Sequence, residues 1–272
     1  VTHSDAGAVT RPGPAVKPMK PSESAAPLIL PALLSWLLFT LFPYSASADQ
    51  LRVATASNFI RSMTELGALF EQENGHQIIV ISGSSGKHFA QIVNGAPYDA
   101  LFAADTERPA RLERERYALA GSRFTYAIGQ LVLWSPREDL VDAQGDVLHS
   151  GGFRRLAIAN PDLAPYGQAA VQVMEALGLE ERLTDRLVRG ENIAQAFQFV
   201  YSGNAELGFV ARSQLRGAGM GGSAWIVPQV HFRPIEQQAV LLTDTRAGRE
   251  FMVFMRGEQA RRLIREHGYG TP

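Results

Sequence analysis

The sequence predicts an α/β fold, because short apolar strands alternate with amphipathic helices along most of the chain. The composition fits an ordinary globular protein: of 272 residues, 46% are hydrophobic and 19% are charged. The formal net charge of −1 argues against a nucleic-acid binder, which needs a basic surface. The absence of cysteine excludes disulfides, thiolate nucleophiles and iron–sulfur clusters.

The first 48 residues are expected to form a leader that is removed from the working protein. Cations precede an apolar run from Leu28 to Phe42, and a Ser-Ala-Ser-Ala segment ends at Ala48. This order is typical of a secretory signal peptide, with translation from Met19 and cleavage after Ala48. The apolar run of 15 residues is short for a membrane anchor, which needs about 20. We therefore expect an exported, soluble chain of 224 residues.

The segment after the leader predicts a strand–helix–strand–helix–strand unit. Ser57 is a good N-cap for the first helix, which Asn74-Gly75 ends, and the second helix passes through Phe89, Ile92 and Val93. Such an alternation indicates a parallel sheet with covering helices. The expected strands cover Leu51–Ala56, Gln77–Ser82 and Ala100–Ala104.

The remainder of the chain continues the alternation. A long strand is expected from Tyr126 to Trp134, where the chain could leave the first lobe. Further strands are expected at Leu156–Ala159, Leu207–Ala211, Trp225–Pro228 and Gln238–Leu242. Helices are expected at Gln168–Leu177, Glu181–Val188, Ile193–Tyr201, Ala247–Met255 and Glu258–His267.

Two turns that follow strands present hydroxyl groups, at residues 55–58 and 82–86. In an open α/β sheet, ligands bind beyond the carboxyl ends of the strands, where helix N-termini point unpaired N–H groups into one crevice. The two turns therefore indicate a site for an anion. The alternative is that Ser57 and Ser85 only cap their own helices.

A hydrolase would need a serine, a histidine and an acid, and no G-x-S-x-G elbow is present. His88, three residues after Ser85, is the one tempting base, although a solvated histidine on the helix surface is the simpler interpretation. Lys87 is the one lysine after the leader. It could steer anions from the rim of a site, or be a solvated helix charge.

Several segments, in order along the chain, resemble the periplasmic molybdate-binding proteins of ABC importers (the ModA family). In the first half they are Thr55-Ala-Ser-Asn-Phe59, Ser82-Gly-Ser-Ser-Gly86, Gln91-Ile-Val-Asn-Gly-Ala-Pro-Tyr-Asp99 and Leu101-Phe-Ala-Ala-Asp105. In the second half they are Leu156-Ala-Ile-Ala-Asn-Pro161, Ala164-Pro-Tyr-Gly-Gln-Ala169, Glu191-Asn-Ile193 and Glu206-Leu-Gly-Phe-Val210. No single segment is decisive, but the combination is specific.

The resemblance implies ligand-binding residues for the oxyanion. First-lobe ligands fall at Ser57 and Ser85, with Asn58 as a further contact, and second-lobe ligands fall at Tyr166 and at the backbone N–H of Ile193. Ser57, Ser85 and Tyr166 are expected to contact molybdate oxygens without ligating the metal. The best-known pattern has a tyrosine where this chain has Ala211 and a small residue at the position of Tyr166. Tyr166 is therefore expected to supply the phenol.

The resemblance also implies a two-lobed periplasmic binding protein fold (type II), each lobe a mostly parallel sheet flanked by helices. It places lobe 1 at residues 49–130 plus 237–272 and lobe 2 at residues 131–236. It implies a periplasmic monomer that carries molybdate, and tungstate, to ABC permease subunits in the inner membrane, without catalysis, cofactor or nucleic acid. The alternatives left open are a sulfate or other oxyanion binder, and an exported serine hydrolase that uses His88.

Overall fold

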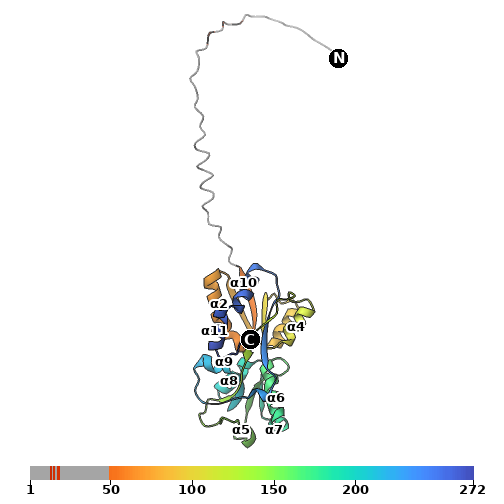
Figure 1. Cartoon of the computed structure of the whole chain (residues 1–272), viewed down its shortest axis with the longest axis vertical. Coiled ribbons are helices and arrows are strands. Elements are labelled where there is room, and N and C mark those ends of the chain that lie inside the picture. Colours follow the sequence, from red (N-terminus) through yellow and green to blue (C-terminus); the bar gives the residue numbers. More distant parts are fainter. Residues whose placement is uncertain (1–12, 14, 16, 19–48) are drawn as a thin grey trace, which may run out of the picture. The chain divides into compact units, whose positions relative to one another are not determined.

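Two five-stranded β-sheets, each with helices on both faces, carry the fold of residues 49–272 (Figure 1). The structure is a computed structural model, and it describes residues 13, 15, 17, 18 and 49–272. The predicted start at Met19 and the predicted cleavage site after Ala48 lie outside these residues. None of the helices in the described part combines the length and the apolar character that crossing a membrane requires.

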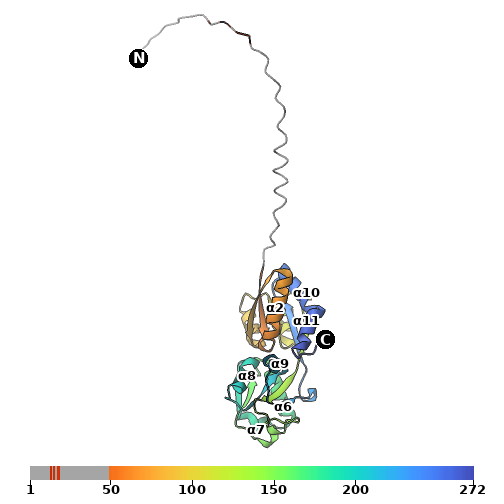
Figure 2. The ribbon, with the colours of Figure 1, turned by 90° about the vertical axis from the view of Figure 1, so that its left-hand side faces the viewer.

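The first sheet contains β1 (Gln50–Ala56), β2 (Gln77–Gly83), β3 (Ala100–Ala103), β4 (Phe124–Gly129) and β10 (Ile235–Leu241), in the order β2-β1-β3-β10-β4. β1 pairs in parallel with β2 and β3, as the strand–helix alternation predicted. β10 runs antiparallel to both of its neighbours. This lobe therefore combines the first and the last elements of the described chain, drawn in orange and dark blue in Figure 2.

Helices cover both faces of the first sheet. The short 3-10 helix η2 (Ser57–Phe59), α2 (Ile60–Asn74), α10 (Arg246–Arg256) and α11 (Glu258–Glu266) lie on one face, and α3 (Ser85–Val93) and α4 (Glu107–Arg114) lie on the other. Phe59, Phe70 and Phe251 fill the core under the first group. Leu101 and Leu112 belong to the core under the second group. Burial of these side chains supplies most of the driving force for folding.

The second sheet repeats the arrangement of the first. It contains β5 (Leu131–Ser135), β6 (Leu156–Ala159), β7 (Leu187–Gly190), β8 (Leu207–Ala211) and β9 (Ser223–Ile226), in the order β7-β6-β8-β5-β9. β6 is parallel to β7 and β8, and β5 is antiparallel to its neighbours. Its helices are α5 (Val147–Ser150), α6 (Pro165–Ala176), α7 (Glu180–Thr184), α8 (Ile193–Tyr201) and α9 (Arg212–Ala218), with the 3-10 helix η3 (Gln229–His231) after β9.

The chain passes between the sheets twice, at Gln130 and between Ile226 and Ile235. The two lobes of the predicted fold class are these two sheets with their helices. The long strand expected from Tyr126 to Trp134 is therefore two strands, because its first part pairs in one sheet and its second part in the other. β10 and β5, which follow the two passages, are the antiparallel strands of their sheets.

Two helices differ from their predicted bounds by more than one residue. The helix expected at Glu181–Val188 ends at Thr184, and Leu187–Gly190 forms the edge strand β7 instead. Pairing with β6 decides this segment, because β-strand formation depends on neighbours as much as on local preference. The helix expected from Gln168 begins at Pro165, a residue that favours the first turn of a helix.

Candidate anion-binding site

The residues predicted to bind the oxyanion all line one small cavity between the two lobes. Its volume is about 10 Å³ for the centre of a water molecule, which is room for about one water-sized group and far too little for a sugar or a peptide. None of the lining residues carries a charge. They are Ala56, Ser57, Asn58, Gly83, Ser84, Ser85, Ala104, Ala164, Pro165, Tyr166, Asn192 and Ile193.

Helix N-termini from both lobes converge on this cavity. In the first lobe, Ser57 and Asn58 open η2 directly after β1, and Ser85 opens α3 after β2. In the second lobe, Tyr166 is the second residue of α6 and Ile193 is the first residue of α8. Because a helix N-terminus carries unpaired N–H groups and the positive end of the helix dipole, the arrangement attracts an anion without any cationic side chain.

The hydroxyls of Ser57 and Ser85 both receive hydrogen bonds from the backbone. Ser85 Oγ accepts from the N–H of Ala104 at 2.9 Å, and Ser57 Oγ accepts from the N–H of Ala194, in the other lobe, at 3.3 Å. Neither hydroxyl donates to an acceptor within the described residues. Each O–H proton is therefore available to a ligand in the cavity.

The alternative that these serines only cap their own helices is wrong. The N-cap of α3 is Ser84, whose hydroxyl accepts from the N–H of Lys87 at 3.4 Å. Ser84 has the extended backbone of an N-cap residue, whereas Ser85 already lies inside the helix. The N-terminus of η2 has no side-chain cap, so Ser57 is free of that role as well.

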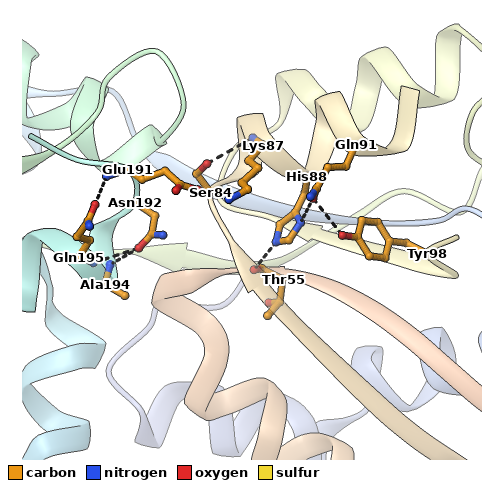
Figure 3. Close-up of polar contacts among 10 residues, drawn as sticks. All are labelled: Thr55, Ser84, Lys87, His88, Gln91, Tyr98, Glu191, Asn192, Ala194 and Gln195. Atoms are coloured by element: carbon orange, nitrogen blue, oxygen red, sulfur yellow. Dashed lines mark hydrogen bonds and ion pairs between the residues drawn. The ribbon is translucent and has the colours of Figure 1, made fainter. Parts of the chain in front are cut away.

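Backbone N–H groups add further donors at the cavity. Asn192 caps α8 by accepting from the N–H groups of Ala194 and Gln195 (Figure 3). The preceding N–H, that of Ile193, has no acceptor within the described part of the chain. The N–H groups of Ser85 and Tyr166 likewise have no acceptor among the described residues. The first turns of these helices thus leave donors for a ligand, as helix termini generally do.

Tyr166 is fully buried and reaches from the second lobe toward the first. Its hydroxyl lies 3.4 Å from Nε2 of Gln237, and a Cβ at Gly129 would overlap it. Burial raises the pKa of Tyr166 well above its ordinary value, so the hydroxyl keeps its proton. Ala211, where the best-known family pattern has a tyrosine, is buried in the core of the second lobe and does not line the cavity.

Asn58 is held by two residues that the sequence did not indicate, Gln237 and Tyr269. Its Nδ2 donates to Gln237 Oε1 at 2.9 Å and to the Tyr269 hydroxyl at 3.1 Å. Its backbone carbonyl accepts from the Tyr269 hydroxyl at 2.6 Å. No motif marks either residue, and both lie far from Asn58 in the sequence, so only the folded structure reveals these contacts.

Besides the contacts of Ser57 with Ala194 and of Tyr166 with Gln237, further contacts join the lobes around the cavity. The N–H of Gly86 donates to the carbonyl of Leu163 at 2.9 Å, and Arg108 Nη2 donates to the carbonyl of Asp162 at 3.1 Å. Lys87 Nζ pairs with Glu191 Oε1 at 2.8 Å. Lys87 is half-exposed and carries this ion pair, so it is not a freely solvated charge.

His88 is buried, so its interpretation as a solvated residue is wrong. Its Nε2 lies 3.1 Å from the carbonyl oxygen of Thr55 and its Nδ1 lies 3.3 Å from Oε1 of Gln91 (Figure 3). Burial lowers the pKa of His88. Periodicity alone did not show that this face of α3 packs on β1, beside Gly83 at the end of β2, which has no side chain to displace the ring. Neither nitrogen faces a serine, so the arrangement offers no base to a hydrolase.

No group of three His, Asp or Glu side chains that could hold a metal ion occurs among the described residues. That the protein needs no cofactor stays a prediction. Any ligand of the cavity meets hydroxyl, amide and backbone N–H groups rather than metal-ligating side chains. The chemistry that the site can perform is therefore recognition of an acceptor-rich ion through hydrogen bonds.

Comparisons with known proteins agree with this arrangement. Residues 51–270 match the family described as bacterial extracellular solute-binding protein. The chain is 47% identical over 235 residues to the molybdate-binding protein ModA of Azotobacter vinelandii (85% of this chain, 93% of that protein) and 44% identical over 229 residues to that of Rhodobacter capsulatus (83% and 90%). The solved structure of the Azotobacter vinelandii periplasmic molybdate-binding protein superposes with a TM-score of 0.79 at 45% identity, covering 82% of this chain and 99% of that one.

A likeness to the sulfate-binding protein SubI of Mycobacterium tuberculosis, at 14% identity and a TM-score of 0.68, shows the shared fold alone. The matches to the solved structures of the Azotobacter vinelandii protein and of SubI both confirm the two-lobed α/β architecture. The relatives named above are binding proteins rather than enzymes, so the hydrolase alternative is wrong. With matches of this identity and coverage, the chain belongs to the ModA family of bacterial extracellular solute-binding proteins.

Proposed function

We propose that this protein captures molybdate in the periplasm and delivers it to the permease of an ABC importer. The observation that carries the proposal is the cavity itself, which presents N–H and O–H donors from both lobes and has no charged residue in its lining. Molybdate is doubly charged and carries no proton at neutral pH, so each of its oxygens needs a donor. The molybdate-binding relatives support this choice of ligand.

The proposed mechanism is binding followed by lobe closure. The first lobe offers the hydroxyls of Ser57 and Ser85, and the second lobe offers the N–H groups of Tyr166 and Ile193. A single ion that accepts from both sets stabilises the closed arrangement relative to the open one, which is the hinge motion expected of two-lobed binding proteins. The dipoles of the converging helices add to the attraction.

Tungstate has the same charge and geometry as molybdate, and we propose that the protein binds it as well. Sulfate also lacks a proton at neutral pH, so the donors alone do not reject it, and its smaller size is the property on which discrimination would depend. Phosphate keeps a proton near neutrality and would favour a carboxylate acceptor. None of the residues that line the cavity supplies one.

The partners and the location belong to the proposal. A binding protein of this kind meets its permease at the outer face of the inner membrane, so we propose export through the signal peptide and cleavage after Ala48. We propose that the protein works as a monomer, without a cofactor and without contact to nucleic acid. The near-zero net charge of the chain is compatible with that last point.

Titration of the exported chain with molybdate, tungstate, sulfate and phosphate tests the proposal by calorimetry and thermal unfolding. A ligand that binds only the folded state stabilises it by about 4 kcal/mol at a thousandfold excess over its Kd. We expect a large upward shift with molybdate and tungstate and none with phosphate. A shift with sulfate alone would change the assigned ligand, and no shift with any of these ions would contradict the proposal.

A further inference from the structure

The side-chain amide of Asn58 is placed beside the cavity in an orientation that gives an anion nothing to accept. Both of its N–H groups donate away from the cavity, to Gln237 and Tyr269. Its Oδ1 is buried and has no hydrogen-bond partner within the described residues. An unpartnered buried acceptor destabilises the folded state, because it has lost its hydrogen bonds to water. Close to a dianion, the same oxygen would also be repelled.

Gln237, which contacts Asn58 and is fully buried, takes part in a second mismatch of hydrogen-bond donors and acceptors. Its Oε1 faces Asn58 Nδ2 and also lies 3.1 Å from the hydroxyl of Tyr126. The same hydroxyl lies 3.2 Å from the carbonyl of Ala103. Tyr126 has one proton for these two acceptors, and burial raises its pKa, so the proton is retained.

A half-turn of both amides about their terminal bonds resolves both conflicts without moving any backbone atom. Gln237 Nε2 then donates to Asn58 Oδ1 and to Tyr126, whose proton goes to Ala103. The Tyr166 hydroxyl, which lies 3.4 Å from the Gln237 amide, donates to Gln237 Oε1. Asn58 Nδ2 takes the place of its unpartnered oxygen and becomes a donor for the ion. The bond from Asn58 Nδ2 to Tyr269 is given up, and Asn58 Oδ1 then lies 3.1 Å from the Tyr269 hydroxyl, which can share its proton between Oδ1 and the Asn58 carbonyl.

We infer that Gln237 is a positioning residue, which turns the Asn58 amide toward the anion when the lobes are closed on it. The inference rests on the proposed function. Tyr166 belongs to the second lobe and Gln237 to β10 of the first, so their contact can form only when the lobes are closed. Closure is thereby coupled to the orientation of a first-lobe donor, through Tyr166, Gln237 and Asn58 in turn. In this proposal the Tyr166 phenol acts through Gln237, in place of the direct contact with the ion that the family resemblance implies.

The backbone around Gln237 is shaped for this contact. The pairing of β10 with β4 shifts register between Gln237 and Gln238, and such a bulge redirects side chains. Gly129 leaves the space in which the Tyr166 hydroxyl and the Gln237 amide meet, because a Cβ at Gly129 would lie 3.0 Å from Gln237 Nε2. Gln238, one residue further on, points elsewhere, to Arg123 and Thr125.

Molybdate affinity, measured by calorimetry, tests the inference in Gln237→Glu and Gln237→Met, with Gln238→Glu as the matched control. Glutamate accepts at both oxygens, so it holds Asn58 Nδ2 away from the ion and places a charge near it. We expect a loss of more than about 100-fold for Gln237→Glu and about tenfold for Gln237→Met. The control should stay within about twofold, since Gln238 contacts no site residue. Equal losses in both Gln237 variants that follow their melting temperatures would indicate a merely structural role and overturn the inference.

A double-mutant cycle provides a readout that a structural role would not move. If the Tyr166 hydroxyl acts through Gln237, Tyr166→Phe weakens binding about fivefold in the wild-type background and hardly at all in Gln237→Met. The same loss in both backgrounds would mean that the hydroxyl contacts the ion directly, which overturns the inference. The side-chain amide signal of Asn58 in ¹⁵N NMR should shift on molybdate addition in the wild type and much less in Gln237→Met.

Failure of the inference and failure of the proposed function give different results in these experiments. A wild-type protein that binds molybdate, together with a Gln237→Glu variant that binds within about threefold of it, overturns the inference only. A folded wild-type protein that binds no molybdate overturns the proposed function, and the inference falls with it.

Discussion

The N–H of Gly86 donates to the carbonyl oxygen of Leu163 across the cleft, at 2.9 Å, and joins the start of α3 to the turn before α6. A Cβ at Gly86 would lie 3.0 Å from both the Cα and the carbonyl oxygen of Leu163. Backbone atoms cannot turn aside as a flexible side chain can. The lobes therefore approach each other as closely as a glycine at this position allows.

We predict that Gly86→Ala weakens molybdate binding about tenfold, because the added methyl group holds the closed lobes apart. Stability without ligand should change little, since the methyl group has space when the lobes open. Calorimetry and thermal unfolding of the same samples measure both quantities. Gly152→Ala is the control, because its Cβ would meet no atom within 4 Å. Unchanged affinity in Gly86→Ala would mean that the closed lobes can accommodate the methyl group and are not in close contact at this position.

Lys87 and Glu191 form an ion pair between the lobes, and both side chains are partly exposed. Exposed pairs contribute little, so we predict that Lys87→Gln raises the molybdate dissociation rate only about two- to fivefold, less at high salt. Glu191→Gln should raise the dissociation rate similarly but speed association, because a negative charge at the cleft is removed.

Stopped-flow measurements at two salt concentrations separate the two rates for this pair. Arg111→Gln serves as the control, since the partner of Arg111, Glu115, lies in the same lobe. If Lys87→Gln slows association and leaves dissociation unchanged, Lys87 steers anions and does not hold the lobes together. The pair would then have no part in closure.

Burial of His88 should make the free energy of unfolding depend on pH. Burial lowers the pKa of His88 in the folded protein below its ordinary value of 6.5, which applies to the unfolded chain. The unfolded state therefore binds more protons between these two values. The stabilising contribution of neutral His88 is complete above pH 6.5 and is lost as pH falls from there to the folded pKa.

We predict that the free energy of unfolding falls less steeply between pH 7 and pH 5 in His88→Gln than in the wild type. Denaturant titrations at a series of pH values measure this slope. His149, which is exposed, supplies the control His149→Gln, in which the slope should match the wild type. Equal slopes in His88→Gln and in the wild type would assign the acid sensitivity to other groups.

Local sequence patterns correctly predicted the strands that are short apolar runs and the helices that have one apolar face. Leu156–Ala159, Ile193–Tyr201 and Leu207–Ala211 are found with the predicted bounds. The segment Leu187–Gly190 was missed because its strand exists through pairing with β6 and not through its own composition. The helix at Arg212–Ala218 had no predicted counterpart either.

The candidate site could be located in advance because its parts follow strand ends and helix starts, which are local features. The hydrogen bonds that hold Asn58 beneath the site could not be predicted from the sequence. Asn58 meets Gln237 across 179 residues and Tyr269 across 211, and no motif connects such distant positions. The same limit explains His88 and Ser84, since helical spacing predicts a face of α3 but not what packs against it.

We predict that Ser57→Ala and Ser85→Ala both weaken molybdate binding but differ in their effect on stability. Each would lose a hydrogen bond to a charged ligand in the alanine variant, which corresponds to a loss of affinity of about ten- to a hundredfold. Ser85 Oγ is also the acceptor for the buried N–H of Ala104, so Ser85→Ala leaves that donor unpartnered and should lower the free energy of unfolding by about 1–3 kcal/mol. The N–H of Ala194 keeps a second acceptor, Asn192 Oδ1 at 3.0 Å, when Ser57 Oγ is removed, so Ser57→Ala should retain wild-type stability.

Calorimetry with molybdate measures the loss of affinity in each variant, and denaturant unfolding without molybdate measures the change in stability. Equal destabilisation of the two variants would contradict this account of how the hydroxyls are held.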